Sequence, residues 1–234
     1  MKSKFLILFS IFALTLPQYL SAQALQTRNV SAFTEISLKI GATVHLTQGN
    51  VQLVEVKGAE GTLNRLITEI NDRKLVLRFP TDTWFSKWNP GPIEVFITMP
   101  QIDALQISGS GSIISEDQID SRILNLVLSG SGDIKLPNLK AEKVSIILSG
   151  SGNIHLAGSG KATELKGALT GSGNIKAIDF QSETVKLKVA GSGNCYVNVI
   201  KELEARLAGS GNVIYRGAPL VDTGILGSGQ VKKE

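Results

Sequence analysis

The stretch Leu148–Ile154 reads LSGSGNI, and close variants of this phrase occur seven times in the C-terminal part of the chain. A period of 18 to 21 residues separates the copies. Their first glycines are Gly109, Gly130, Gly150, Gly171, Gly191, Gly209 and Gly227. A period near twenty, with glycines between short β-like runs, predicts a solenoid in which each repeat buries its apolar face against its neighbours.

Two positions of the phrase are aliphatic in almost every copy, and their alternation with polar neighbours predicts that both face the core. Two residues before the first glycine stand Ile107, Leu128, Leu148, Leu169, Val189, Leu207 and Ile225. Four residues after it stand Ile113, Ile134, Ile154, Ile175, Cys195, Val213 and Val231. The only cysteine therefore falls in a core column, where a thiol behaves as a small hydrophobic group. No intramolecular disulfide can form.

A polar column follows the Gly-Ser-Gly corner: Ser112, Asp133, Asn153, Asn174, Asn194, Asn212 and Gln230. One interpretation is structural, because glycine supplies positive φ at a corner and Asn or Asp side chains bond to nearby backbone. The other is a binding surface, in which a row of amides and hydroxyls meets sugar hydroxyls. An eighth Gly-Ser-Gly at Gly158–Gly160 is out of phase, and we interpret it as a second corner of one rung.

The chain from residue 29 to residue 100 lacks the glycine period but keeps strand signals. Strands are expected at 30–36, 42–47, 51–56, 75–79 and 93–99. Residues 66–70 could pair with 75–79 as a hairpin, or Leu63, Leu66, Ile67 and Ile70 could form one face of a short helix. We expect residues 23–100 to form the first layers and cap of the solenoid, residues 101–234 to form its regular part, and 23–234 to be one continuous domain.

The first 22 residues combine Lys2 and Lys4 with an apolar stretch and a small-residue exit at Ser21-Ala22. This pattern predicts a signal peptide and a mature chain that begins at Gln23 and is exported to the periplasm, the cell surface or the medium. No later apolar run reaches the length of a transmembrane helix. Removing the two lysines lowers the net charge from +4 to +2, with no basic block, which argues against a nucleic-acid partner.

Catalytic and metal-binding patterns are not evident. The carboxylates do not recur at one repeat position, and neither His45 nor His155 has a neighbour at metal-ligand spacing. The sequence therefore favours a noncatalytic protein with no metal and no cofactor. A polysaccharide-active β-helix enzyme, a lyase or a hydrolase, is the alternative, and a purely structural periplasmic module is a third interpretation.

Two segments are candidate ligand-binding sites. The Pro-rich stretch 81–92 contains Trp84, Phe85 and Trp88, aromatic residues that could stack on sugar rings or contact a partner. Five residues after the first glycine, Lys135, His155, Lys176 and Tyr196 are expected on successive rungs, where they would form a basic stripe suited to an acidic glycan or an anionic headgroup.

A third surface is apolar. Val127, Ile147 and Ala168 are expected to point outward on successive rungs, so another segment or a second subunit could cover them, and a homodimer is possible.

Several segments also resemble a known family. They are Val30-Ser31-Ala32-Phe33 with Ile36 and Gly41, then 97–100 before Leu105, and the GSGNI units at 150–154 and 171–175. Together they are similar to the auto-transporter adhesin head GIN domain proteins of bacterial envelopes. The resemblance implies an exported parallel β-helix with a role in adhesion and supplies no catalytic residues. Right-handedness comes from this resemblance and from the general bias of parallel crossovers.

Overall fold

The computed structural model describes residues 23–81 and 89–234. Almost all regular structure in these residues is β, and the one helix among them is α1 (Glu60–Leu63). The strands are β1 (Gln23–Thr27), β2 (Glu35–Leu38), β3 (Thr43–Gln48), β4 (Leu53–Ala59), β5 (Ile67–Asn71), β6 (Lys74–Arg78), β7 (Glu94–Met99), β8 (Ala104–Gly109), β9 (Ser112–Ile114), β10 (Ile119–Gly130), β11 (Asp133–Leu136), β12 (Leu139–Gly150), β13 (Asn153–Gly171), β14 (Asn174–Gly191), β15 (Asn194–Gly209), β16 (Asn212–Gly217), β17 (Leu220–Leu226) and β18 (Gln230–Lys233).

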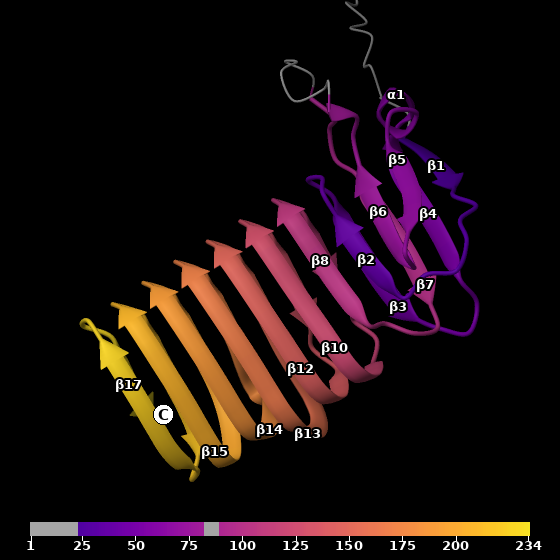
Figure 1. Ribbon diagram of the computed structural model, residues 1–234. Helices are drawn as coiled ribbons and strands as arrows, with labels where there is room; N and C mark the ends of the chain where they lie inside the picture. The colour runs from indigo at the N-terminus through magenta and orange to yellow at the C-terminus, as the bar shows by residue number, and fades with distance from the viewer. Residues whose placement is uncertain (1–22, 82–88) are drawn as a thin grey trace, which may run out of the picture.

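The repeat forms a β-solenoid with parallel strands in register. β10 pairs with β8 on one side and with β12 on the other, and Gly130 lies beside Gly109 and Gly150. Each rung crosses two faces. The long face contains β8, β10, β12, the second halves of β13, β14 and β15, and β17; the short face contains β9, β11, the first halves of β13, β14 and β15, β16 and β18. Figure 1 shows the long face from β8 to β17.

The Gly-Ser-Gly corner between the two faces requires both of its glycines. The first glycine of all seven copies has a positive φ, between 115° and 128°. The second glycine is packed against the rung before it: a Cβ on Gly132 would lie closer than 3.0 Å to the carbonyl oxygen of Gly111. A residue with a side chain would therefore fit at this position only if the two rungs moved apart. The corner is thus a structural element, as the first interpretation of the phrase proposed.

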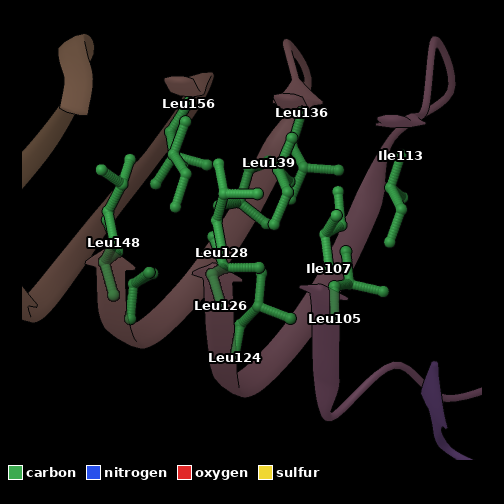
Figure 2. Close-up of a cluster of buried hydrophobic side chains, with 14 of the residues drawn as sticks. Leu105, Ile107, Ile113, Leu124, Leu126, Leu128, Leu136, Leu139, Leu148 and Leu156 are labelled. Carbon is green, nitrogen blue, oxygen red and sulfur yellow. The ribbon is translucent and has the colours of Figure 1, made fainter. Parts of the chain in front are cut away.

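The core is a stack of aliphatic side chains between the two faces (Figure 2). Leu128 and Leu148 contribute from the long face and Ile134 and Ile154 from the short face, and none is more than 1 % exposed. The prediction of buried columns holds through Leu207 and Val213. It is wrong for Ile225, which is 46 % exposed, and Val231 is only partly buried, because no described rung follows theirs.

The out-of-phase Gly158–Gly160 lies within β13, at the second of two shifts of register in this strand. Ala157 pairs with Asp179 and Lys161 with Gln181, so four steps of one rung lie opposite two steps of the next. The extra residues form a bulge in this strand. The segment therefore lies where this rung passes from the short face to the long face, which is the position of the second corner that the sequence suggested.

The rungs in the N-terminal half do not stack in chain order. The β2–β3 rung lies between the β6–β7 rung and the β8–β9 rung. Antiparallel strands complete the outer end: β4 pairs with β7, β1 with β4, and β5 with β6. This end of the solenoid is covered, as a terminal repeat requires.

The hairpin interpretation of residues 66–79 is confirmed, and the helix alternative is wrong. β5 and β6 are antiparallel, and Asp72 and Arg73 between them have φ of 49° and 63°. Positive φ at both central residues is the requirement of a tight hairpin turn. The helix that does form, α1, ends before this segment, at Leu63.

Candidate functional site

The short face aligns the residues of the expected basic stripe. Lys135 pairs with His155, His155 with Lys176, and Lys176 with Tyr196 in the parallel register. All four alternate with buried core residues and point outward. Lys135 and Lys176 are exposed, and His155 and Tyr196 are partly buried. Neighbouring rungs are about 4.8 Å apart, so the column is a continuous row of side chains.

The structure extends this row in both directions. Beyond Tyr196 it continues through Ile214 to Lys232. Beyond Lys135 it passes Ile114 and then His45, which pairs with Phe96. The rings of His45 and Phe96 stack with centroids 4.9 Å apart and an angle of 14° between the planes. We call this row, Phe96, His45, Ile114, Lys135, His155, Lys176, Tyr196, Ile214 and Lys232, the short-face stripe.

Sequence reasoning missed His45 and Phe96 because they lie outside the glycine repeat. The β2–β3 rung places His45 next to Ile114, although 69 residues of chain separate them. The available signal was the alternation of β3, in which His45 stands between the buried Val44 and Leu46. That alternation predicts an outward side chain but does not give the rung order.

The centre of the stripe carries little compensating charge. Lys135 lies 3.7 Å from Asp133, measured from Nζ to Oδ2. Within the described part of the chain, Lys176 and His155 form no ion pair. The next outward positions along these rungs are Pro137, Ala157, Ile178 and Asn198, but the register places the exposed Asp179 beside Ala157. Asp179 lies 3.4 Å from Arg216, and Asp133 lies 3.7 Å from Lys135, so both carboxylates already have a cationic partner.

The polar column beside the stripe is occupied by bonds within itself. Asn174 donates from Nδ2 to Oδ1 of Asn153 at 2.9 Å, and Asn153 donates to Oδ1 of Asp133 at 3.0 Å. Asn194 and Asn212 continue the chain of amides at 3.3 and 2.9 Å. Each amide donates toward the preceding rung, so the first member needs only to accept, and a carboxylate such as Asp133 only accepts. These contacts favour the structural interpretation of the column.

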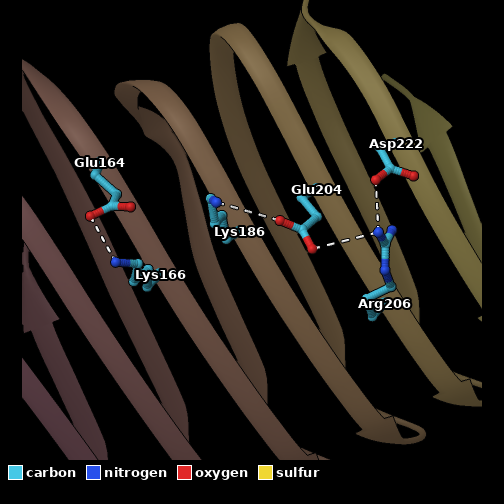
Figure 3. Close-up of polar contacts among 6 residues, drawn as sticks. All are labelled: Glu164, Lys166, Lys186, Glu204, Arg206 and Asp222. Carbon is cyan, nitrogen blue, oxygen red and sulfur yellow. Dashed lines mark hydrogen bonds and ion pairs between the residues drawn. The ribbon is translucent and has the colours of Figure 1, made fainter.

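On the long face, several cations form ion pairs with neighbouring carboxylates (Figure 3). Glu164 pairs with Lys166 at 3.0 Å, and Glu204 pairs with both Lys186 at 3.6 Å and Arg206 at 3.5 Å. Arg206 also donates to Asp222 at 2.7 Å, and this hydrogen bond holds the pKa of Asp222 below its ordinary value. Lys188, Lys143 and Arg122 on this face form no ion pair with a described residue.

The apolar patch expected on the long face is present. Ile147 is 50 % exposed and lies between Val127 and Ala168 on adjacent rungs. A shallow groove of about 380 Å³ runs beside Ile147 over Gly167. None of the described residues covers the patch.

Other predicted features lie partly or wholly beyond the structure. Trp84, Phe85 and Trp88 fall in 82–88, and the expected signal peptide in 1–22, both outside the described residues. Within 23–81 and 89–234, no three His, Cys, Asp or Glu side chains gather as a metal site would require. The described helix is too short to cross a membrane.

A family model covers most of the chain. Residues 32–219 match the model described as "Putative auto-transporter adhesin, head GIN domain". The chain belongs to this family. The match spans the capped N-terminal rungs as well as the glycine repeat, so the head GIN domain includes both. No curated protein sequence is significantly similar to this one.

Solved structures share the fold of this head GIN domain. An adhesin-like protein of Bacteroides fragilis, described as a putative adhesin, superposes with a TM-score of 0.84 at 20 % identity, over 91 % of this chain and 97 % of its own. A putative lipid binding protein of Parabacteroides distasonis gives 0.73 at 23 %, over 91 % and 96 %. A putative adhesin of Parabacteroides merdae gives 0.70 at 21 %, over 91 % and 96 %. At these identities the likeness shows the β-solenoid fold alone.

The cysteine of this head GIN domain has no access to a ligand. Cys195 is 0 % exposed between Ile175 and Val213, as the core column predicted. Burial raises the pKa of its thiol to about 12. A neutral, enclosed thiol is neither a nucleophile nor a metal ligand.

Proposed function

We propose that this head GIN domain is an exported, noncatalytic surface protein that binds an anionic glycan along the short-face stripe in the course of adhesion. The observation that supports it most strongly is the row of outward side chains over neighbouring rungs, in which His155 and Lys176 form no ion pair with a described residue. The family description as an adhesin supports the class of function.

The shape of the stripe suits a linear polymer. Cations repeat along the solenoid axis with Lys135, Lys176 and Lys232, and aromatic rings stand among them at His155 and Tyr196. Carboxylates or sulfates of an extended chain would contact the cations, and sugar rings would pack on the aromatic faces. Because these charges are solvent-exposed, added salt should weaken the binding.

The long face is a weaker candidate for the same ligand. Its Lys166, Lys186 and Arg206 already have carboxylate partners, and a polyanion would have to displace Glu164 and Glu204. On the short face Asp133 accepts a hydrogen bond from Asn153 and lies 3.7 Å from Lys135, whereas Lys176 forms no ion pair with a described residue. That engagement also leaves Asp133 poorly placed as a catalytic acid or base, which favours binding over glycan cleavage.

Calorimetric titration of the chain from Gln23 to Glu234 with polygalacturonate tests the proposal. The double variant Lys135→Ser/Lys176→Ser should bind about tenfold more weakly, as expected for two exposed contacts of roughly 0.7 kcal/mol each. The matched control Lys166→Ser/Lys186→Ser removes the same charge from the long face and should keep the original affinity. Equal weakening by both variants, or no binding by the unmodified protein, would rule out the stripe.

Catalysis and location need separate tests. Incubation with polygalacturonate should release no shorter chains; their appearance would support the polysaccharide-active alternative. Proteolysis of intact cells should degrade the protein if it is on the outer surface, whereas full protection would place it inside the envelope.

A further inference from the structure

The two ends of the solenoid are built differently. The end formed by the β6–β7 rung is covered by β5 and by β4 with β1. At the other end, β17 pairs with β15 and β18 with β16, and no strand from the described residues pairs with their outer edges. Figure 1 shows β17 at the edge of the stack. An unprotected edge strand exposes a row of free backbone N–H and C=O groups.

The exposed edge is also apolar. Among the described residues nine large hydrophobic side chains are exposed, and four of them lie in the seven residues of β17. They are Leu220 at 80 %, Val221 at 43 %, Ile225 at 46 % and Leu226 at 78 %. β17 contains one charged residue, Asp222, and none of the lysines or prolines that usually prevent edge pairing. A surface of this kind is typical of an interaction site.

The order of residues in β17 is self-complementary. In an antiparallel pair of two β17 strands centred on Thr223, Leu220 lies opposite Leu226 of the other copy, and Val221 lies opposite Ile225. Opposite residues of an antiparallel pair share a face. Leu220 and Leu226 of the two copies therefore meet on the outer surface, and Val221 and Ile225 extend the core. Every exposed hydrophobic residue of the strand finds an apolar partner.

The charges are complementary in the same register. Asp222 lies opposite Gly224 of the other copy, and the side chain of Arg206 passes over Gly224 within its own copy: a Cβ there would be 3.0 Å from Arg206 Cδ. Each Asp222 therefore faces an arginine of the other copy as well as its own Arg206, which it contacts at 2.7 Å. No like charges oppose each other along the strand.

From these observations we infer that β17 is a dimerisation strand, and that two copies of this chain join end to end by antiparallel β17 pairing about a two-fold axis at Thr223. Such an interface uses the same patch on both subunits. The axis is perpendicular to the long face, so both copies present their short-face stripes on the same side. The inference does not depend on glycan binding.

Analytical ultracentrifugation gives the first test, at protein concentrations up to the submillimolar range. The unmodified chain should show a concentration-dependent dimer of elongated shape. Leu220→Lys/Leu226→Lys places lysines opposite lysines and should yield monomer. Leu220→Lys/Leu226→Glu places opposite charges together in the proposed register and should restore the dimer. Leu220 and Leu226 are exposed in each copy, so each variant should retain the circular dichroism spectrum of the parent.

A disulfide tests the register directly. Thr223→Cys places two thiols opposite each other on the axis, at the separation that a disulfide spans, while the buried Cys195 does not react. Oxidation should link this variant at the dimer concentration, whereas Ser172→Cys, on an exposed corner, should link no faster than random collision. A monomer at all concentrations, a dimer that survives the double lysine variant, or equal linking of both cysteine variants would overturn the inference.

Discussion

Substituting alanine for three glycines of the Gly-Ser-Gly corners separates the two physical reasons for glycine there. Gly109 has φ of 127° and open space where a Cβ would be. Gly132 does not have a φ in the left-handed region, but its Cβ would overlap the Gly111 carbonyl. Gly130 has both restrictions, with φ of 128° and its Cβ against the carbonyl of Gly109.

The expected costs follow from these differences. Gly109→Ala should lower the free energy of unfolding by about 1–3 kcal/mol, the cost of a side chain at a backbone conformation that only glycine adopts readily. Gly132→Ala should lower the free energy of unfolding by about 1–3 kcal/mol or more for a different reason, because the rungs must separate to admit the methyl group. Gly130→Ala should cost approximately the sum, about 2–6 kcal/mol.

Urea unfolding followed by circular dichroism measures these differences, with Gly61→Ala as the control. A Cβ on Gly61 meets nothing within 4 Å and requires no unusual φ, and Gly61 lies in α1, so this variant should be as stable as the parent or more stable by up to about 1 kcal/mol. If Gly132→Ala were as stable as Gly61→Ala, the close stacking of rungs at the corner would be disproved.

Three further predictions concern the core and the amide column. Ile154→Asp should unfold the protein, because a buried unpaired carboxylate costs several kcal/mol, whereas the neighbouring outward His155→Asp should give a normal melting curve; similar curves for both would contradict the alternation of β13. Asn174→Ala removes hydrogen bonds to Asn153 and Asn194 and should lower the free energy of unfolding by about 1–3 kcal/mol, with Ser172→Ala as an exposed control; equal stability would refute the ladder. The raised pKa of Cys195 means that the unfolded thiol loses its proton first as pH rises, so stability should fall from its ordinary pKa of 9.0 toward about 12. Between pH 8 and pH 11 the free energy of unfolding should fall by about 2–3 kcal/mol more for the unmodified chain than for Cys195→Val. Identical changes with pH in the two proteins would show that the thiol is not buried.

The repeat made much of the fold predictable from sequence. Each rung reuses one phrase, so aligning the copies gives the neighbour of every residue, and the register of Lys135, His155 and Lys176 follows by counting. The same counting placed Cys195 in the core. Where two rungs flank a residue, the column determines its burial.

The failures occur where the repeat ends. Ile225 occupies a core column but has no described rung beyond it, and a column alone does not reveal that absence. The N-terminal rungs pair through contacts between distant segments, some of them antiparallel, so no period fixes their order. For that reason the stripe could be followed from Lys135 to Tyr196 but not to His45 and Phe96.

Lysine acetylation footprinting tests most directly the claim that the ligand binds on the short-face stripe. The chain is treated with an acetylating reagent with and without polygalacturonate, and modification is measured by mass spectrometry. Lys135 and Lys176 should be protected by the polymer, while Lys166 and Lys186, equally accessible on the long face, should react as before. Protection of the long-face lysines with continued reaction of Lys135 and Lys176 would contradict the account.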